Sequence, residues 1–254
     1  MRMTNDRAAA LRALHVPGRP VVLPNAWDAA SARAIERAGF PGVATSSAAI
    51  ADCLGLADGE QAPVEEMLAA ATRVVRSVTV PVTVDFERGY RLAPAEVVER
   101  FAATGAAGLN LEDSDPATSE LVDPEEQVAF LAAVRDAALA AGVDLVINAR
   151  VDAFARMAAE PEVKLASAIE RANQYLRAGA DCAYPIGVSE PPVVRSLVNG
   201  IAGPVNVGLG LAAPLAVDDL AALGVARVTF GPGLQRHVYG AFERETLPTL
   251  RPTR

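Results

Sequence analysis

Residues 82–87 read Val-Thr-Val-Asp-Phe-Glu, an apolar run that becomes polar at its carboxyl end through Asp85 and Glu87. Residues 109–113, Leu-Asn-Leu-Glu-Asp, and residues 146–150, Val-Ile-Asn-Ala-Arg, end in the same way. In each stretch two polar side chains stand at positions i and i+2, which places both on one face of a β-strand. Three such endings predict strands whose carboxyl ends meet at one mouth, lined by carboxylates and an arginine.

Ala-rich helical stretches that end in glycine alternate with short apolar segments along the chain. Glycine readily adopts the left-handed conformation that closes a helix, so each glycine marks a helix end before a new strand. These glycines are Gly39, Gly105, Gly142, Gly179 and Gly224. Strands are expected at residues 21–25, 42–46, 80–86, 107–112, 144–150, 181–186, 204–209 and 226–231.

The expected strands are too apolar to have a face in water, which favours a parallel sheet covered by helices. Eight strand and helix units favour a closed (β/α)8 barrel of the TIM type over an open doubly wound sheet. We expect a single α/β domain over residues 1–254, with an N-terminal helix in 1–18 and a C-terminal helix and tail in 233–254.

Composition excludes several classes of function. The net charge of −8 argues against a nucleic-acid partner, because a phosphate backbone requires a basic surface. No apolar run approaches the ~20 residues of a membrane span, and no secretory signal precedes the first helix, so no membrane partner and a cytoplasmic location are expected. Cys53 and Cys182 are too few for a disulfide framework. The two histidines, His15 and His237, lie outside the predicted strand ends, which disfavours a histidine-built zinc site.

Carboxylates dominate the predicted mouth. Asp85, Glu87 and Glu112 come from two neighbouring strands, and bare carboxylates at such range raise one another's pKa. A hard divalent cation relieves that repulsion, and oxygen ligands suit Mg²⁺, with Mn²⁺ as an alternative. The structural alternative is that these acids cap helices, and for Asp113 we favour that interpretation.

Other polar residues lie at the same strand ends. Arg150 would either pair with the acids or clamp a substrate carboxylate in a bidentate manner. Ser46 and Ser47 offer an anion-binding turn, although serines also cap helices. Trp27, which follows the first strand, would either line the pocket or pack in the core. Asn206, in the seventh predicted strand, is a further candidate for substrate binding.

Several of these segments, taken together and in order, resemble the isocitrate lyase/phosphoenolpyruvate mutase superfamily. They are LPNAWDAASARAIERAGFPGVATSS, LGLADG, VPVTVDFERGY, GLNLEDS and INARVDAF, and the resemblance runs from about residue 20 to residue 232. It implies an oligomeric (β/α)8 barrel, with an exchanged C-terminal helix that is shortened or missing here. It also implies Mg²⁺, small α-oxo or α-hydroxy acids as ligands, and chemistry through a pyruvate-type enolate.

The resemblance also assigns residues. It makes Asp85 the principal metal ligand, with Glu87 standing where most members have Asp, and Glu112 a further acid of the metal shell. It implies that Asp58 lies near the metal and the substrate, that Arg150 binds the substrate carboxylate, and that the backbone N–H groups of Ser46 and Ser47 do so too. The proton donor stays open between Tyr90, Asp58 and a water molecule.

The chain departs from the family's known enzymes in the loop after Glu112. Residues 113–127 read DSDPATSELVDPEEQ, without the Lys-(Lys/Arg)-Cys-Gly-His segment of isocitrate and methylisocitrate lyases and without the Lys/Asn-bearing loop of the mutase. Tyr184-Pro185 also stands where those lyases have an acid. These departures disfavour all three of those activities.

We therefore expect an Mg²⁺-dependent lyase that cleaves or forms a C–C bond in a small carboxylic acid and yields an α-keto acid. Oxaloacetate-type decarboxylation is the favoured reaction, because it needs only a metal and an electron sink. The alternatives are a phosphonopyruvate-type P–C hydrolase or mutase and a non-catalytic protein that binds α-keto acids. A homo-oligomer, dimer or tetramer, is expected.

Overall fold

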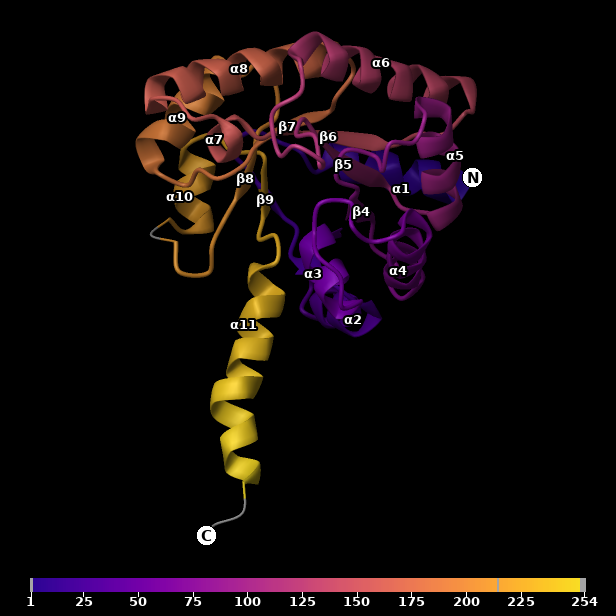
Figure 1. Cartoon of the computed structure of the whole chain (residues 1–254), viewed down its shortest axis with the longest axis vertical. Helices are drawn as coiled ribbons and strands as arrows, with labels where there is room; N and C mark the ends of the chain where they lie inside the picture. The colour runs from indigo at the N-terminus through magenta and orange to yellow at the C-terminus, as the bar shows by residue number, and fades with distance from the viewer. Residues whose placement is uncertain (1, 214, 252–254) are drawn as a thin grey trace.

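The computed structural model describes residues 2–213 and 215–251, in which helices and parallel strands alternate (Figure 1). The strands are β1 (Val21–Val22), β2 (Asn25–Ala26), β3 (Val43–Thr45), β4 (Val82–Asp85), β5 (Gly108–Glu112), β6 (Val146–Val151), β7 (Cys182–Pro185), β8 (Asn206–Gly208) and β9 (Arg227–Thr229). The helices are α1 (Arg2–Ala13), α2 (Ala29–Arg37), α3 (Ser47–Cys53), α4 (Val64–Arg76), α5 (Pro94–Thr104), α6 (Pro124–Ala140), α7 (Ala153–Arg156), α8 (Pro161–Arg177), α9 (Pro191–Gly200), α10 (Val217–Ala222) and α11 (Gly233–Ala241). Every predicted strand range overlaps an observed strand.

All strand pairs in the two sheets are parallel, which confirms the predicted α/β architecture. One sheet has the order β2-β3-β4-β5-β6-β7 and the other the order β1-β9-β8. The chain passes from one sheet to the other at Pro24: Leu23 donates to Val228 in β9, and Ala44 in β3 donates to Pro24. An isolated parallel bridge between Ala183 and Val205 connects β7 to the segment that precedes β8.

Alternation along β4 explains how the strands position the site. Val82 and Val84 are buried in the main apolar core, together with side chains of α4 and α5. Thr83 and Asp85 lie on the opposite face, because successive side chains of a strand point to opposite sides. The glycine helix ends predicted from sequence all have positive φ; Gly105, at the end of α5, has φ 78°. The next strand, β5, begins only three residues later.

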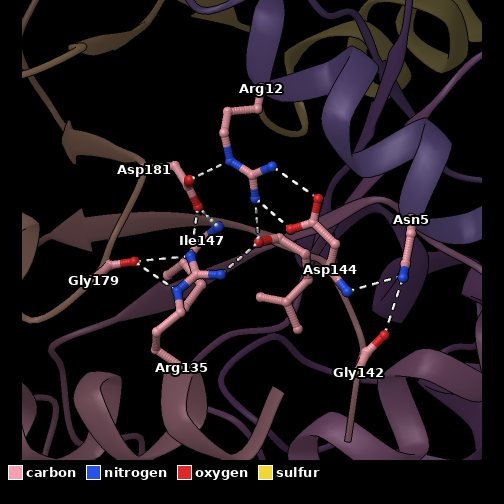
Figure 2. Close-up of polar contacts among 9 residues, drawn as sticks. Asn5, Arg12, Arg135, Gly142, Asp144, Ile147, Gly179 and Asp181 are labelled. Carbon is pink, nitrogen blue, oxygen red and sulfur yellow. Dashed lines mark hydrogen bonds and ion pairs between the residues drawn. The ribbon is translucent and has the colours of Figure 1, made fainter. Parts of the chain in front are cut away.

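An ion-pair network ties α1 to the amino ends of β6 and β7 (Figure 2). The Arg12 guanidinium donates to both carboxylate oxygens of Asp144 at 2.9 and 2.6 Å and to Asp181 at 2.7 Å. Arg135 reaches the other oxygen of Asp181 at 2.7 Å, and the Asn5 side chain bonds both Gly142 and Asp144. Hydrogen bonding to Arg12 holds the pKa of Asp144 below its usual range.

The C-terminal segment is helical from α11 onward, and the expected shortening or loss of an exchanged helix stays a prediction. α11 continues into one π-helical turn (Phe242–Thr246) and one 3₁₀ turn (Leu247–Leu250). The segment extends away from the rest of the chain (Figure 1). Within the described parts of the chain, every helix is too short or too polar to cross a lipid bilayer.

Candidate active site

Asp85 stands at the carboxyl end of β4, held by donors from the start of α3 and from β5. Its Oδ2 accepts from the Ser47 backbone N–H at 3.1 Å and from the Ser47 hydroxyl at 2.9 Å, and its Oδ1 accepts from Asn110 Nδ2 at 3.2 Å. The Asp85 N–H donates to the Thr45 hydroxyl at 3.0 Å. Ser46, for its part, caps α3 through its hydroxyl. The two serines therefore orient Asp85 and begin α3, and their role toward a substrate stays a prediction.

Glu87 lies just beyond β4 in a strained loop. It is buried, and its φ of +47° lies in the left-handed region that side chains with a Cβ avoid. The Tyr90 hydroxyl donates to its Oε1 at 2.6 Å, and the Glu60 N–H donates to its Oε2 at 2.6 Å. The Glu60 carboxylate in turn accepts from the N–H groups of Tyr90 and Arg88. This reciprocal arrangement holds the loop after β4 against the loop before α4.

Burial raises the pKa of Glu87 to about 7, aided by repulsion from Asp58 and Asp85 and opposed by the hydrogen bond from Tyr90. Burial, with the negative charge of Glu87, also raises the pKa of Tyr90, so this phenol stays protonated and serves as a donor. Partial removal from water, and then repulsion from Asp85, raise the pKa of Asp58. Asp58, Asp85 and Glu87 therefore repel one another electrostatically.

Glu112 and Arg150 face each other directly across β5 and β6. The pair is formed by Glu112 Oε2 and Arg150 Nη1 at 2.6 Å. Asp152 holds the other side of the guanidinium, accepting from Nε at 2.6 Å and from Nη2 at 3.0 Å. Burial raises the pKa of Glu112 and Arg150 opposes this, while Asp152, Asp85 and Glu87 raise it further. Arg150 is therefore an ion-pair partner of the acids and places a cation at the acidic cluster.

Asp113 is buried and serves the site indirectly. It accepts from the Asp152 N–H at 2.8 Å, from the Tyr175 hydroxyl at 2.8 Å and from Arg171 at 3.1 Å. The prediction that Asp113 caps a helix is wrong, because Asp123 is the N-cap of α6. Asp113 instead anchors the backbone of Asp152, which orients Arg150.

Trp27 and Asn206 are the remaining predicted substrate-binding residues. Trp27 is half-buried, with its ring 6.4 Å from that of Tyr239 in α11, and it lines an apolar 540 Å³ cavity between α2 and α11. Asn206 is fully buried in β8, where its Oδ1 accepts from the Thr229 hydroxyl at 3.3 Å. Both assignments stay predictions.

A 490 Å³ cavity lies beside Glu60 and Tyr90. Its wall is formed by residues 59–64 of the loop before α4, by Tyr90 and Arg91, and by Pro116 and Ala117. The last two belong to the loop after β5, which is the segment that departs most from the known lyases. The loop that departs from the known lyases thus borders a cavity that is also lined by Tyr90, whose hydroxyl bonds Glu87.

The acids fit a hydrated divalent cation better than a closed protein cage. Among residues 2–213 and 215–251 no three His, Cys, Asp or Glu side chains lie close enough to form such a cage. Mg²⁺ usually keeps several of its waters and takes only one or two carboxylates directly. The electrostatic coupling of Asp58, Asp85, Glu87 and Glu112 supplies the negative charge that such an ion requires.

Sequence reasoning missed Glu60 and Asp152. Asp152 stands two residues after Arg150, the same i and i+2 pattern that identified the other acids, and could have been found. Glu60 lies in a loop without periodicity and carries no local signal.

A parallel α/β scaffold with acids and one arginine at the carboxyl ends of its strands is the arrangement expected of the isocitrate lyase/phosphoenolpyruvate mutase superfamily. The chain belongs to the phosphoenolpyruvate phosphomutase family, which matches residues 11–249. Members of the superfamily are lyases or mutases and generally use a divalent metal ion.

Individual relatives span several activities. An uncharacterized protein of Mycobacterium tuberculosis H37Rv is 35% identical over 220 residues, which cover 86% of this chain and 80% of the relative. The oxaloacetate decarboxylase of Rhodopseudomonas palustris TIE-1 is 33% identical over 219 residues, or 82% of this chain and 72% of that enzyme. A crystal structure from Burkholderia cenocepacia J2315, provisionally assigned as a phosphonomutase, has a TM-score of 0.90 at 41% identity and covers 94% of this chain and 98% of its own.

Proposed function

We propose that this protein is an Mg²⁺- or Mn²⁺-dependent lyase that breaks a C–C bond in a small carboxylic acid and releases an α-keto acid. Decarboxylation of oxaloacetate or a close analogue is its favoured reaction. The observation that carries the proposal is the coupling of Asp85, Glu87 and Glu112 beside the Arg150 guanidinium. The identity of 33% with an oxaloacetate decarboxylase supports the choice of reaction.

The cation would polarise the keto oxygen of the substrate and stabilise the enolate charge. Asp85 would hold it directly, and Glu87 and Glu112 through water. Asp152 occupies two nitrogens of Arg150, so the Nη1 edge, which faces Glu112, is where a substrate carboxylate would bind. A preorganised guanidinium at that edge favours the charge that develops during bond scission.

Decarboxylation breaks the bond between C3 and the C4 carboxylate of oxaloacetate. The electron pair stays on the three-carbon fragment as the pyruvate enolate, CO₂ leaves, and a proton added at C3 gives pyruvate. Tyr90 is suited to deliver that proton, because its phenol stays protonated and its hydroxyl already donates a 2.6 Å hydrogen bond to Glu87.

The test follows pyruvate formation from oxaloacetate with Mg²⁺ or Mn²⁺. We expect Asp85→Ala to lower turnover to the rate of metal and buffer alone, while Asp218→Ala, a change at an exposed aspartate of α10, retains the wild-type rate. Wild-type protein that does not exceed the Asp85→Ala rate would rule out this reaction.

One observation favours a second candidate, a phosphonopyruvate-type P–C hydrolase or mutase. The Burkholderia structure that matches at 41% identity is assigned to that chemistry. Turnover of phosphonopyruvate, followed by phosphorus NMR, together with inert oxaloacetate would favour it. Tight keto-acid binding without turnover of either compound would instead favour a non-catalytic binding protein.

We also propose that the two sheets close into a (β/α)8 barrel and that the protein is a homo-oligomer. The Ala183–Val205 bridge and the strand break at Pro24 support closure, since each joins one sheet to the other.

The extended C-terminal segment supports the oligomer. It exposes Tyr239, Phe242 and Leu250, apolar side chains that a second copy would cover. Light scattering that gave a monomeric mass at micromolar concentration would contradict the oligomer.

A further inference from the structure

Arg227 is an unusual side chain, because it is a buried cation with almost no partner. It lies in β9 with 0% exposure and is the largest fully buried side chain among the residues that the structure describes. In the part of the chain that the structure describes, it forms no ion pair, and its Nε and Nη1 atoms lack a hydrogen-bond partner. Its Nη2 donates to Asn110 Oδ1 at 3.4 Å, across 117 positions of sequence.

A role in stability alone does not explain this residue. Removing a guanidinium from water costs several kcal/mol, and an apolar side chain of similar size would avoid that cost. Burial lowers the pKa of Arg227, while Cys182, Tyr184 and Asp85 oppose this. Burial also raises the pKa of Cys182 to about 12 and that of Tyr184 above its usual value, so both are neutral at pH 7. The Asp85 carboxylate is then the negative charge that stabilises this cation.

A chain of two hydrogen bonds runs from Arg227 through the Asn110 side chain to Asp85. Arg227 determines which end of the Asn110 carboxamide faces Asp85. Arginine carries donors only, so the end of the Asn110 carboxamide that faces Arg227 must be its oxygen. Asn148 Nδ2 donates to the same oxygen at 2.8 Å. Asn148 can present either end of its own carboxamide, so it does not determine the direction by itself. With the Asn110 oxygen engaged, its Nδ2 points to Asp85 Oδ1 at 3.2 Å.

We propose that Arg227 is a positioning residue for the acidic site: it orients the Asn110 carboxamide, which then donates to Asp85 and holds that carboxylate for cation binding. The inference rests on the proposed function, because it takes Asp85 as the direct metal ligand. Residues that orient metal ligands typically change metal affinity or activity by about 10- to 100-fold when mutated.

The test compares Arg227→Gln with Arg227→Lys. Glutamine can donate or accept and so allows the Asn110 carboxamide to turn over, whereas lysine keeps a donor-only cation. By calorimetry with Mn²⁺ we expect Arg227→Gln to weaken binding about 10-fold and Arg227→Lys to stay within about 3-fold of wild type. Arg195→Gln, at an exposed arginine of α9, is the matched control and should not change the affinity.

Further measurements separate positioning from a purely structural role. A structural role would lower the denaturant midpoint of both Arg227 variants and leave the Mn²⁺ affinity of the folded protein unchanged. In the positioning role Arg227→Gln also lowers kcat for oxaloacetate more than it raises KM. Adding Arg227→Gln to Asn110→Ala should cause little further loss of Mn²⁺ affinity or kcat, because both changes interrupt the same chain of hydrogen bonds. Fully additive losses, or equal Mn²⁺ affinity in all variants, would overturn the inference.

A readout without metal distinguishes this inference from the proposed function. Wild-type protein that binds no Mn²⁺ would contradict the proposed metal-dependent function. Even then, the role of Arg227 can be tested through the rate at which the Asn110 side-chain NH₂ exchanges its hydrogens with solvent. This rate is measured by NMR, with the signal assigned by its absence in Asn110→Ala. We expect slow exchange with solvent in wild type and Arg227→Lys and fast exchange in Arg227→Gln. Equal exchange in the three proteins would refute the orienting role.

Discussion

Replacing Glu87 by glutamine should make the metal-free protein more stable at neutral pH. The buried carboxyl has a pKa of about 7 in the folded chain, against an ordinary value of 4.5. Between these two pH values the folded state keeps a proton that the unfolded state has lost. The free energy of unfolding therefore falls as the pH rises from 4.5 to 7, and the full contribution of the protonated carboxyl is present only below pH 4.5.

The size of the effect follows from the two pKa values. They differ by about 2.5 pH units, and at 1.36 kcal/mol per unit this gives about 3 kcal/mol. Other acids of the site have raised pKa values too, so wild-type protein alone does not isolate Glu87. The difference in unfolding free energy between Glu87→Gln and wild type isolates the contribution of Glu87. This difference should shift in favour of the variant by about 3 kcal/mol between pH 4.5 and pH 7.5.

The assay is urea unfolding in EDTA at several pH values between 4.5 and 8, followed by circular dichroism. Glu99→Gln, at an exposed glutamate of α5, is the control and should give a curve parallel to wild type. Adding Mg²⁺ should reduce the advantage of Glu87→Gln, because the ion stabilises the ionised carboxylate. Parallel curves for Glu87→Gln and wild type in EDTA would refute the electrostatic account of the site.

Three further predictions concern other parts of the chain. Burial lowers the pKa of His15 from 6.5 to about 4, so the contribution of its neutral ring to stability is present above pH 6.5 and is lost as the pH falls toward 4. In urea titrations, the free energy of unfolding of His15→Gln should therefore fall by about 3 kcal/mol less than that of wild type between pH 6.5 and pH 4. Arg12→Ala should cost about 1 kcal/mol of unfolding free energy, more than Arg100→Ala, which breaks a more exposed pair. Asp152→Asn should lower kcat for oxaloacetate about 100-fold, because Arg150 loses its bidentate partner.

Much of the scaffold could be predicted because it depends on local geometry. The alternation of Val82, Thr83, Val84 and Asp85 follows from the strand repeat of two residues, whatever the strand packs against. The same reasoning placed Glu112 and Arg150 on one side of their strands. The interpretation of Asp113 was wrong because cap propensity is a local preference, and three donors from α8 and the end of β6 outweigh it.

The sequence by itself determined roughly where the strands lie along the chain, at which glycines several helices end, and which polar side chains leave the strand ends on a common face. Only the tertiary structure decided which of those side chains meet: the Glu112–Arg150 pair, the Glu60 and Glu87 contacts, and the contact of Arg227 with Asn110. The reason is that the strand repeat acts over two residues, whereas these contacts join positions 27 to 117 residues apart. Their geometry depends on how the parallel strands are staggered, and no local pattern records that stagger.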